Sequence, residues 1–115
     1  MKINWNKVRI FLKPGITDMR KQINGLSILA ESEMNINPLS GNLFLFCNRS
    51  RQILKCLYWD NNGFCLWQKR LEIDKFPWPE NEESVYELTE MELNMLLTGV
   101  DFFHKHKKLS FNSIY

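Results

Sequence analysis

The side chains of this sequence best suited to metal binding or nucleophilic attack are its three cysteines. Cys47, Cys56 and Cys65 lie nine residues apart without a CxxC pair, and His104 and His106 follow much later. This is not a spacing used to bind zinc. An odd number of evenly spaced cysteines indicates free thiols in a reducing compartment. We therefore predict no metal site and no cofactor.

Carboxylates are the second group of side chains with catalytic potential. Asp18, Asp60 and Asp101 could in principle assemble into the metal-binding cluster of a nuclease. Each also has a simpler role, in the first turn of a helix, in a hairpin turn and at a helix end. The sequence has no phosphate-cradling glycine loop, no nucleophile elbow and no paired-histidine motif. We therefore predict no catalytic residue, and a metal-dependent nuclease is the least favoured alternative.

Charge is distributed unevenly along the chain. Residues 1–75 carry twelve Lys and Arg against six Asp and Glu, whereas residues 76–104 carry seven acids and no Lys or Arg. This pattern indicates a basic body that meets phosphate and an acidic segment that meets a basic protein. The alternative is a pair of solvated faces that balance one another.

Six cations are the candidates for contact with phosphate. Arg20 and Lys21 fall in the first turn of a predicted helix, where the macrodipole disfavours cations. The free backbone N–H groups at that helix end would form a phosphate-binding corner with these two side chains. The turn that follows residue 47 adds a second basic point. The six predicted contacts are Arg20, Lys21, Arg49, Arg51, Lys55 and Arg70.

A small number of predicted elements must position these residues. Composition and alternation predict strands at residues 7–13, 42–47, 52–59 and 64–71, the last two joined by the turn Asp60-Asn61-Asn62-Gly63. One helix is predicted from its N-cap Thr17 to residue 30, and a second from the capping box of Thr89 and Glu92 to Gly99. The order β-α-β-β-β-α predicts a single small α+β domain, residues 1–104, with a mainly antiparallel sheet. Residues 105–115 are predicted to form a basic C-terminal tail.

Three aromatic side chains of the hairpin decide whether it is core or binding surface. Alternation places Trp59 and Phe64 on one face of the hairpin and Trp67 on the other. Because a chain of 115 residues must bury most of its large side chains, we predict that all three are buried, with Trp59 close to Phe64 or Leu66. The alternative is an exposed aromatic surface that stacks on bases.

Five short motifs, taken together, resemble those of one known family. The motif residues are Thr17, Asp18, Met19, Arg20 and Lys21; Leu57, Tyr58, Trp59 and Asp60; Gly63 and Phe64; Lys69, Arg70 and Leu71; and Phe76, Pro77, Trp78 and Pro79. In these residues, and from about Val8 to Phe102, the chain is similar to the accessory protein encoded by the second open reading frame of insertion-sequence-66-type transposons. It departs from the usual pattern at Gln22, where the family has a glycine, and at Cys47-Asn48, where the family is more basic.

The resemblance implies a protein that acts with a separate transposase and a second small accessory protein, without a known biochemical activity. We therefore expect a non-catalytic accessory protein whose basic face contacts DNA phosphates. Its acidic second helix and residues 79–84 would face a protein partner. The alternative is an adaptor that joins proteins without touching nucleic acid, and only DNA contact would make binding fall steeply with salt. The sequence begins without an apolar signal core and has no run long enough to span a membrane, so we expect a cytoplasmic location without membrane contact.

Overall fold

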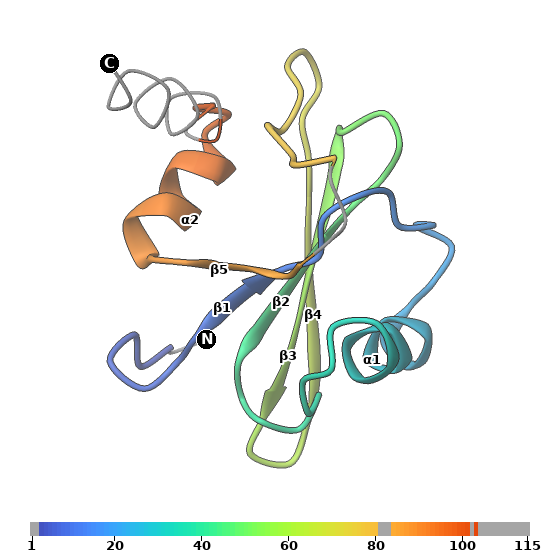
Figure 1. The fold of residues 1–115 in the computed structure, drawn as a ribbon, viewed down its shortest axis with the longest axis vertical. Coiled ribbons are helices and arrows are strands. Elements are labelled where there is room, and N and C mark those ends of the chain that lie inside the picture. Colours follow the sequence, from blue (N-terminus) through green and yellow to red (C-terminus); the bar gives the residue numbers. More distant parts are fainter. Residues whose placement is uncertain (1–2, 81–83, 102, 104–115) are drawn as a thin grey trace.

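A five-stranded sheet with one helix on each face forms the body of the protein (Figure 1). The computed structural model describes residues 3–80, 84–101 and 103. The predicted tail, residues 105–115, and the two histidines lie outside the described residues. The elements are β1 (Ile10–Leu12), α1 (Ile23–Ser32), β2 (Leu43–Cys47), β3 (Ile53–Asp60), β4 (Gly63–Arg70), β5 (Tyr86–Leu88) and α2 (Glu90–Leu97).

The strands lie in the order β4-β3-β2-β1-β5. β1 and β2 are parallel, and α1 connects them, as parallel neighbours require a crossover. The other three pairings are antiparallel. The predicted α+β class and element order are confirmed. The sequence did not predict β5, a three-residue strand that pairs with β1 just before α2.

Two apolar clusters fill the space on either side of the sheet. Strand alternation sends Phe44 and Phe46 of β2 towards α1. It sends the other three residues of β2 to the opposite face, where they pack with α2 and with Phe76 and Trp78 of the connection that follows β4. All five residues of β2 are buried because both faces of this central strand are covered.

The β3–β4 hairpin has the predicted register, with Trp59 opposite Phe64 and Leu57 opposite Leu66. The Trp59 and Phe64 rings meet edge to face with their centroids 5.1 Å apart, which confirms that predicted contact. Both rings are half-buried. The prediction that Trp67 is buried was wrong, because 39% of this residue is exposed. β4 is an edge strand, and α2 packs beside β5 at the opposite edge of the sheet, so no helix covers Trp67.

The first helix begins at Ile23 with Gln22 as its N-cap, five residues later than predicted. Thr17 does not cap it. The Thr17 N–H donates to the carbonyl of Cys47 at 2.8 Å, so the chain at Thr17 still lies alongside the end of β2. A separate turn follows, in which the Lys21 N–H donates to the carbonyl of Asp18. Arg20 and Lys21 therefore precede the helix, and the prediction that they lie in its first turn was wrong.

The second helix forms as predicted. Thr89 Oγ1 accepts from the N–H of Glu92, and the Glu92 carboxylate accepts from the N–H of Thr89. Gly99, at φ +85°, follows the last turn in the left-handed conformation that glycine adopts most readily. In the part of the chain that the structure describes, neither helix is long and apolar enough to cross a membrane.

Candidate functional site

Three chain segments meet at the end of the sheet where β1, β2 and β4 finish and β3 begins, the upper end in Figure 1. We call this region the basic end and define it as residues 13–22, 48–52 and 70–80. Hydrogen bonds join the segments, from Gly15 N–H to the Pro79 carbonyl at 2.9 Å and from Phe76 N–H to the Arg51 carbonyl at 2.7 Å. Five of the six predicted phosphate contacts lie on these segments: Arg20, Lys21, Arg49, Arg51 and Arg70.

Lys55, the sixth predicted contact, is not on the surface. Only 2% of it is exposed, and its ammonium donates to the carbonyls of Met19 and Lys21, each at 2.9 Å. Burial lowers the pKa of this ammonium. The position lies on the α1 face of β3, where the turn before α1 covers it, so the predicted contact of Lys55 with DNA is corrected to a structural role.

Lys69 has a similar role on the other face of the sheet. Its ammonium donates to the carbonyl of Leu97 at 2.9 Å, at the last residue of α2. A cation is favoured there because the carbonyl end of a helix carries partial negative charge. Lys69, one of the family motif residues, therefore links β4 to the carbonyl end of α2.

Three arginines of the basic end form exposed ion pairs. Arg20 pairs with Asp18 at 2.6 Å, Arg51 with Glu80 at 2.8 Å and Arg70 with Glu72 at 2.9 Å. The hydrogen bonds from Arg20 lower the pKa of Asp18 to about 2. Exposed pairs of this kind contribute at most about 1 kcal/mol, so a phosphate can replace the carboxylate.

Arg49 and Lys21 differ from these three arginines. Neither has an acidic partner among the residues that the structure describes. Both are exposed. Of the five predicted contacts on the basic end, they are the two that form no ion pair with the described residues, and Lys75, which is also exposed, is a third such cation.

The β2–β3 turn fixes the direction of the arginines it carries. Asn48 Oδ1 accepts from the N–H groups of Gln52 and Ile53, both at 3.1 Å. Arg51 has φ +60°, a conformation that costs a non-glycine residue on the order of 1 kcal/mol. Its carbonyl is held by Phe76, so the turn is fixed at both ends.

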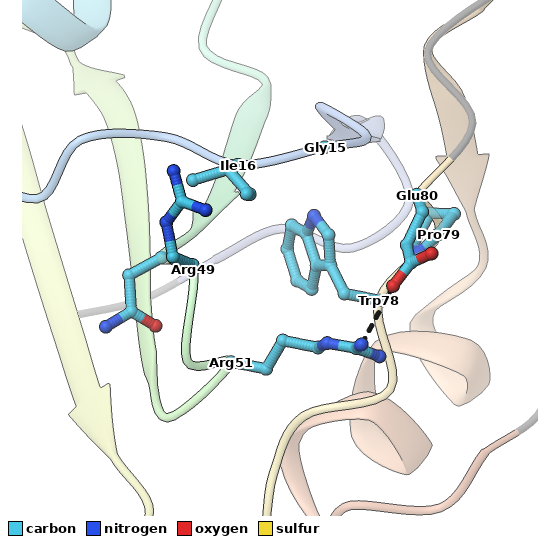
Figure 2. Close-up of a pocket in the computed structure, with 8 residues that line it drawn as sticks. Gly15, Ile16, Arg49, Arg51, Trp78, Pro79 and Glu80 are labelled. Atoms are coloured by element: carbon cyan, nitrogen blue, oxygen red, sulfur yellow. Dashed lines mark hydrogen bonds and ion pairs between the residues drawn. The ribbon is translucent and has the colours of Figure 1, made fainter.

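A pocket of about 270 Å³ opens between this turn and the segment that follows β1 (Figure 2). The Trp78 ring stands at its centre, with Ile16 to one side and the Arg51 side chain to the other. Trp78 is held in place because its Nε1–H donates to the Lys13 carbonyl at 3.0 Å. The pocket combines an apolar wall with two guanidinium groups, which suits an anion that carries an apolar portion. Its lining residues are Gly15, Ile16, Asn48, Arg49, Arg51, Trp78, Pro79 and Glu80.

The cysteines and aspartates do not form a reactive centre. Burial raises the pKa of the Cys47 and Cys56 thiols to about 12, which disfavours the thiolate that metal binding and nucleophilic attack require. Asp18 lies at the basic end and Asp60 at the opposite end of β3. Among the described residues, no group of three or more His, Cys, Asp or Glu is placed to hold a metal.

The Phe76-Pro77-Trp78-Pro79 motif ties the basic end together. Phe76 and Trp78 are buried against the sheet, and the backbone of this motif bonds to both other segments. The sequence predicted only a proline-fixed connection here. Two large aromatics spaced to face one side of an extended chain were the signal that it covers a core. For Lys55, the signal was a single cation inside an apolar strand.

Comparisons with known proteins identify the family of this chain. The chain matches the family described as IS66 Orf2 like protein over residues 8–107. The uncharacterized protein y4hO of Sinorhizobium fredii (strain NBRC 101917 / NGR234) is 38% identical over 97 residues, which is 84% of each chain. The uncharacterized protein y4jC of the same strain is 31% identical over 101 residues, 88% of this chain and 86% of that one. No solved structure matches the chain. The chain therefore belongs to the IS66 Orf2-like family, and its role is that of an accessory protein in the transposition of such an element.

Proposed function

We propose that this accessory protein is non-catalytic and binds the DNA backbone through its basic end. The observation that carries the proposal is the position of Arg49 and Lys21, two exposed cations without an acidic partner among the described residues, on a rigid end of the sheet. Positive charge held on a fixed surface binds the phosphates of DNA with the release of counterions.

Arg49 is the first expected phosphate contact, because it is exposed and lines the pocket beside Ile16 (Figure 2). A phosphate that approaches Arg49 also meets Arg51, whose guanidinium can leave the exposed Glu80 and form a fork with the phosphate oxygens. The apolar wall of Trp78 and Ile16 then contacts the sugar or an unpaired base. Such contacts position the protein on DNA and read no sequence directly.

The acidic part of the chain is proposed to face the protein partners, the transposase and the second accessory protein of the element. Glu90 and Glu92 lie in the first turn of α2, on the sheet face opposite α1. Met91, between them, is 68% exposed and offers an apolar contact within the acidic surface. Residues 81–83 of the predicted acidic loop lie outside the described residues.

The dependence of DNA affinity on salt tests this proposal. Arg49→Glu should weaken binding to DNA of any sequence about tenfold or more at low salt, and should lower the slope of log affinity against log salt by roughly one. The matched control is Lys7→Glu, the same charge change on an exposed residue before β1, away from the basic end. If both variants lose the same affinity, only net charge matters and the site is wrong; if neither loses any, the basic end does not contact DNA.

A protein adaptor without DNA contact is the second candidate, and the ion pairs favour it. Arg20, Arg51 and Arg70 each already have a carboxylate partner, which reduces the positive potential of the basic end. Copurification with the transposase after complete nuclease digestion, together with no salt-dependent DNA binding by the isolated protein, would establish this candidate in place of the first.

A further inference from the structure

The two edges of the sheet are protected to different degrees. β5 has three residues, and its central Glu87 is ion-paired with Arg9 at 2.7 Å. β4 has eight residues, contains no proline, and carries no charge before Lys69. In the part of the chain that the structure describes, no strand pairs with its outer side. Monomeric proteins avoid long uncharged edge strands, because these pair readily with another strand.

Side chains on both faces of β4 are also incompletely covered. Phe64 and Leu66 are half-buried on the face towards α1. On the other face Cys65 is half-buried and 39% of Trp67 is exposed. A strand added at this edge would cover apolar groups on both faces, in addition to bonding the free backbone groups.

We propose that β4 pairs antiparallel with β4 of a second copy of this chain, which joins two sheets into one across a two-fold axis. The axis passes beside Cys65, so that Cys65 lies opposite Cys65 of the second copy. In an antiparallel pair, residues directly opposite each other share a face. This register therefore keeps the α1 faces of both copies on the same side of the joined sheet.

Side-chain complementarity selects this register. It pairs residues 63–67 of the two copies. It places Phe64 opposite Leu66, an apolar pair that the two-fold axis repeats. It also places Trp67 over Gly63, where an aromatic ring covers a glycine that has no side chain.

The neighbouring registers lack this complementarity. Centring the axis on Leu66 sets Phe64 against Gln68, an apolar side chain opposite a polar one. Centring it on Phe64 leaves only residues 63–65 of the two strands paired.

Disulfide trapping tests the register in the full chain. Opposite residues of an antiparallel pair have Cα atoms about 4.5–5.5 Å apart, within the range that a disulfide spans. Mild oxidation with copper phenanthroline should therefore trap a covalent dimer of the wild-type protein, whereas Cys65→Ser should yield none. Cys47 and Cys56 are buried and serve as internal controls. A dimer that crosslinks equally well in Cys65→Ser would overturn the register.

Sedimentation tests the same pairing without cysteine chemistry. Trp67→Lys removes the ring that covers Gly63 and puts a charge on the edge of β4, so the dimer dissociation constant in analytical ultracentrifugation should rise about tenfold or more. Trp5→Lys, the same change at an exposed tryptophan before β1, is the matched control and should leave the constant unchanged. A protein that sediments as a monomer at every concentration, or a Trp67→Lys variant that dimerises as tightly as the control, would overturn the proposal.

Two further measurements distinguish the failure of this inference from the failure of the proposed DNA contact. Arg49→Glu should leave the dimer unchanged, and Trp67→Lys should leave the phosphate contacts of the basic end intact. If the chain is monomeric but Trp67→Lys abolishes copurification with the transposase, the β4 edge serves another protein and the pairing of two copies is wrong.

Discussion

Lys55 and Arg49 carry the same charge and lie six residues apart, but they have opposite roles. The Lys55 ammonium is buried and bound to two backbone carbonyls, so its charge is satisfied inside the protein. Arg49 lies in the β2–β3 turn, exposed and without an acidic partner among the described residues. The difference follows from the element that carries each residue. A strand with both faces covered must bury every side chain, whereas a turn directs its side chains to solvent.

The comparison shows that counting cations along the sequence overestimates the charge available to a ligand. Lys69 has a carbonyl partner, and Arg20, Arg51 and Arg70 have carboxylate partners. The surface of the basic end is therefore less positive than its composition indicates. Its affinity for phosphate depends on the few cations without partners and on those with exposed pairs that can exchange.

The largest expected effect is the loss of Lys55. Lys55→Met keeps the apolar stem but leaves the carbonyls of Met19 and Lys21 without their donor, so the free energy of unfolding should fall by about 2–4 kcal/mol. Denaturant unfolding measures this loss of stability. Lys21→Met, which removes an exposed cation two residues from Met19, is the control and should change stability by less than about 0.5 kcal/mol. Equal small effects of both changes would show that Lys55 is not a structural cation.

The next effect is expected at Trp78, which joins the interior of the basic end to its pocket. Trp78→Phe removes the Nε1–H donor of the Lys13 carbonyl and leaves part of a buried volume empty, which should cost about 1–3 kcal/mol. Trp67→Phe, the same change at the half-exposed edge, should cost clearly less. If Trp67→Phe proves as destabilising as Trp78→Phe, the assignment of Trp67 to an open edge is contradicted.

A smaller effect is expected at Lys69, the second interior cation. Lys69→Met removes a donor from the carbonyl end of α2 and should lower the free energy of unfolding by about 1 kcal/mol. Arg70→Met, at the adjacent position, should produce no measurable change, because the pair of Arg70 with Glu72 is exposed. Thermal unfolding of the two variants side by side measures the contrast.

The sequence predicted most of the fold because its strongest signals are local. The Asp60–Gly63 turn and the alternation around it determined the hairpin register, and Thr89 with Glu92 determined the start of α2. These elements depend on contacts within a few residues, which composition and spacing reveal.

The predictions that were wrong concerned residues whose contacts are with distant segments of the chain. Thr17 resembles an N-cap by residue type, but its N–H pairs with Cys47, thirty residues away, and this delays the helix. Trp67 resembles a core residue, but the order of the strands places it at an edge. Five of the six predicted cations do gather at one end, because strand polarity brings their turns together. The burial of Lys55 depends on the turn before α1, which is distant from Lys55 in the sequence.

Arg51 provides a test in which stability and binding should change in opposite directions. Its φ of +60° suits glycine, so Arg51→Gly should leave the free energy of unfolding unchanged or raise it by up to about 1 kcal/mol. DNA affinity should nevertheless fall, with a salt slope lower by roughly one, because the guanidinium is lost from the pocket. Arg51→Lys keeps the charge in the strained conformation and is the control. A glycine variant that binds DNA as tightly as the parent would remove Arg51 from the proposed interface.

The smallest expected effect is the acid titration of Asp18. The hydrogen bonds from Arg20 hold the pKa of this carboxylate at about 2, below its ordinary value of 3.8. Because the folded pKa is the lower one, the pair stabilises the fold above about pH 4, and this contribution disappears as the pH falls towards 2. Carboxyl carbon NMR should show the low midpoint in the wild type and a higher midpoint in Arg20→Met, which loses the side-chain donors but keeps the backbone N–H of residue 20. DNA phosphate that displaces Asp18 from Arg20 would raise the same midpoint in the complex. If the Asp18 midpoint is low in the free protein and does not change when DNA binds, Arg20 is a structural cation, as Lys55 is, and does not contact phosphate.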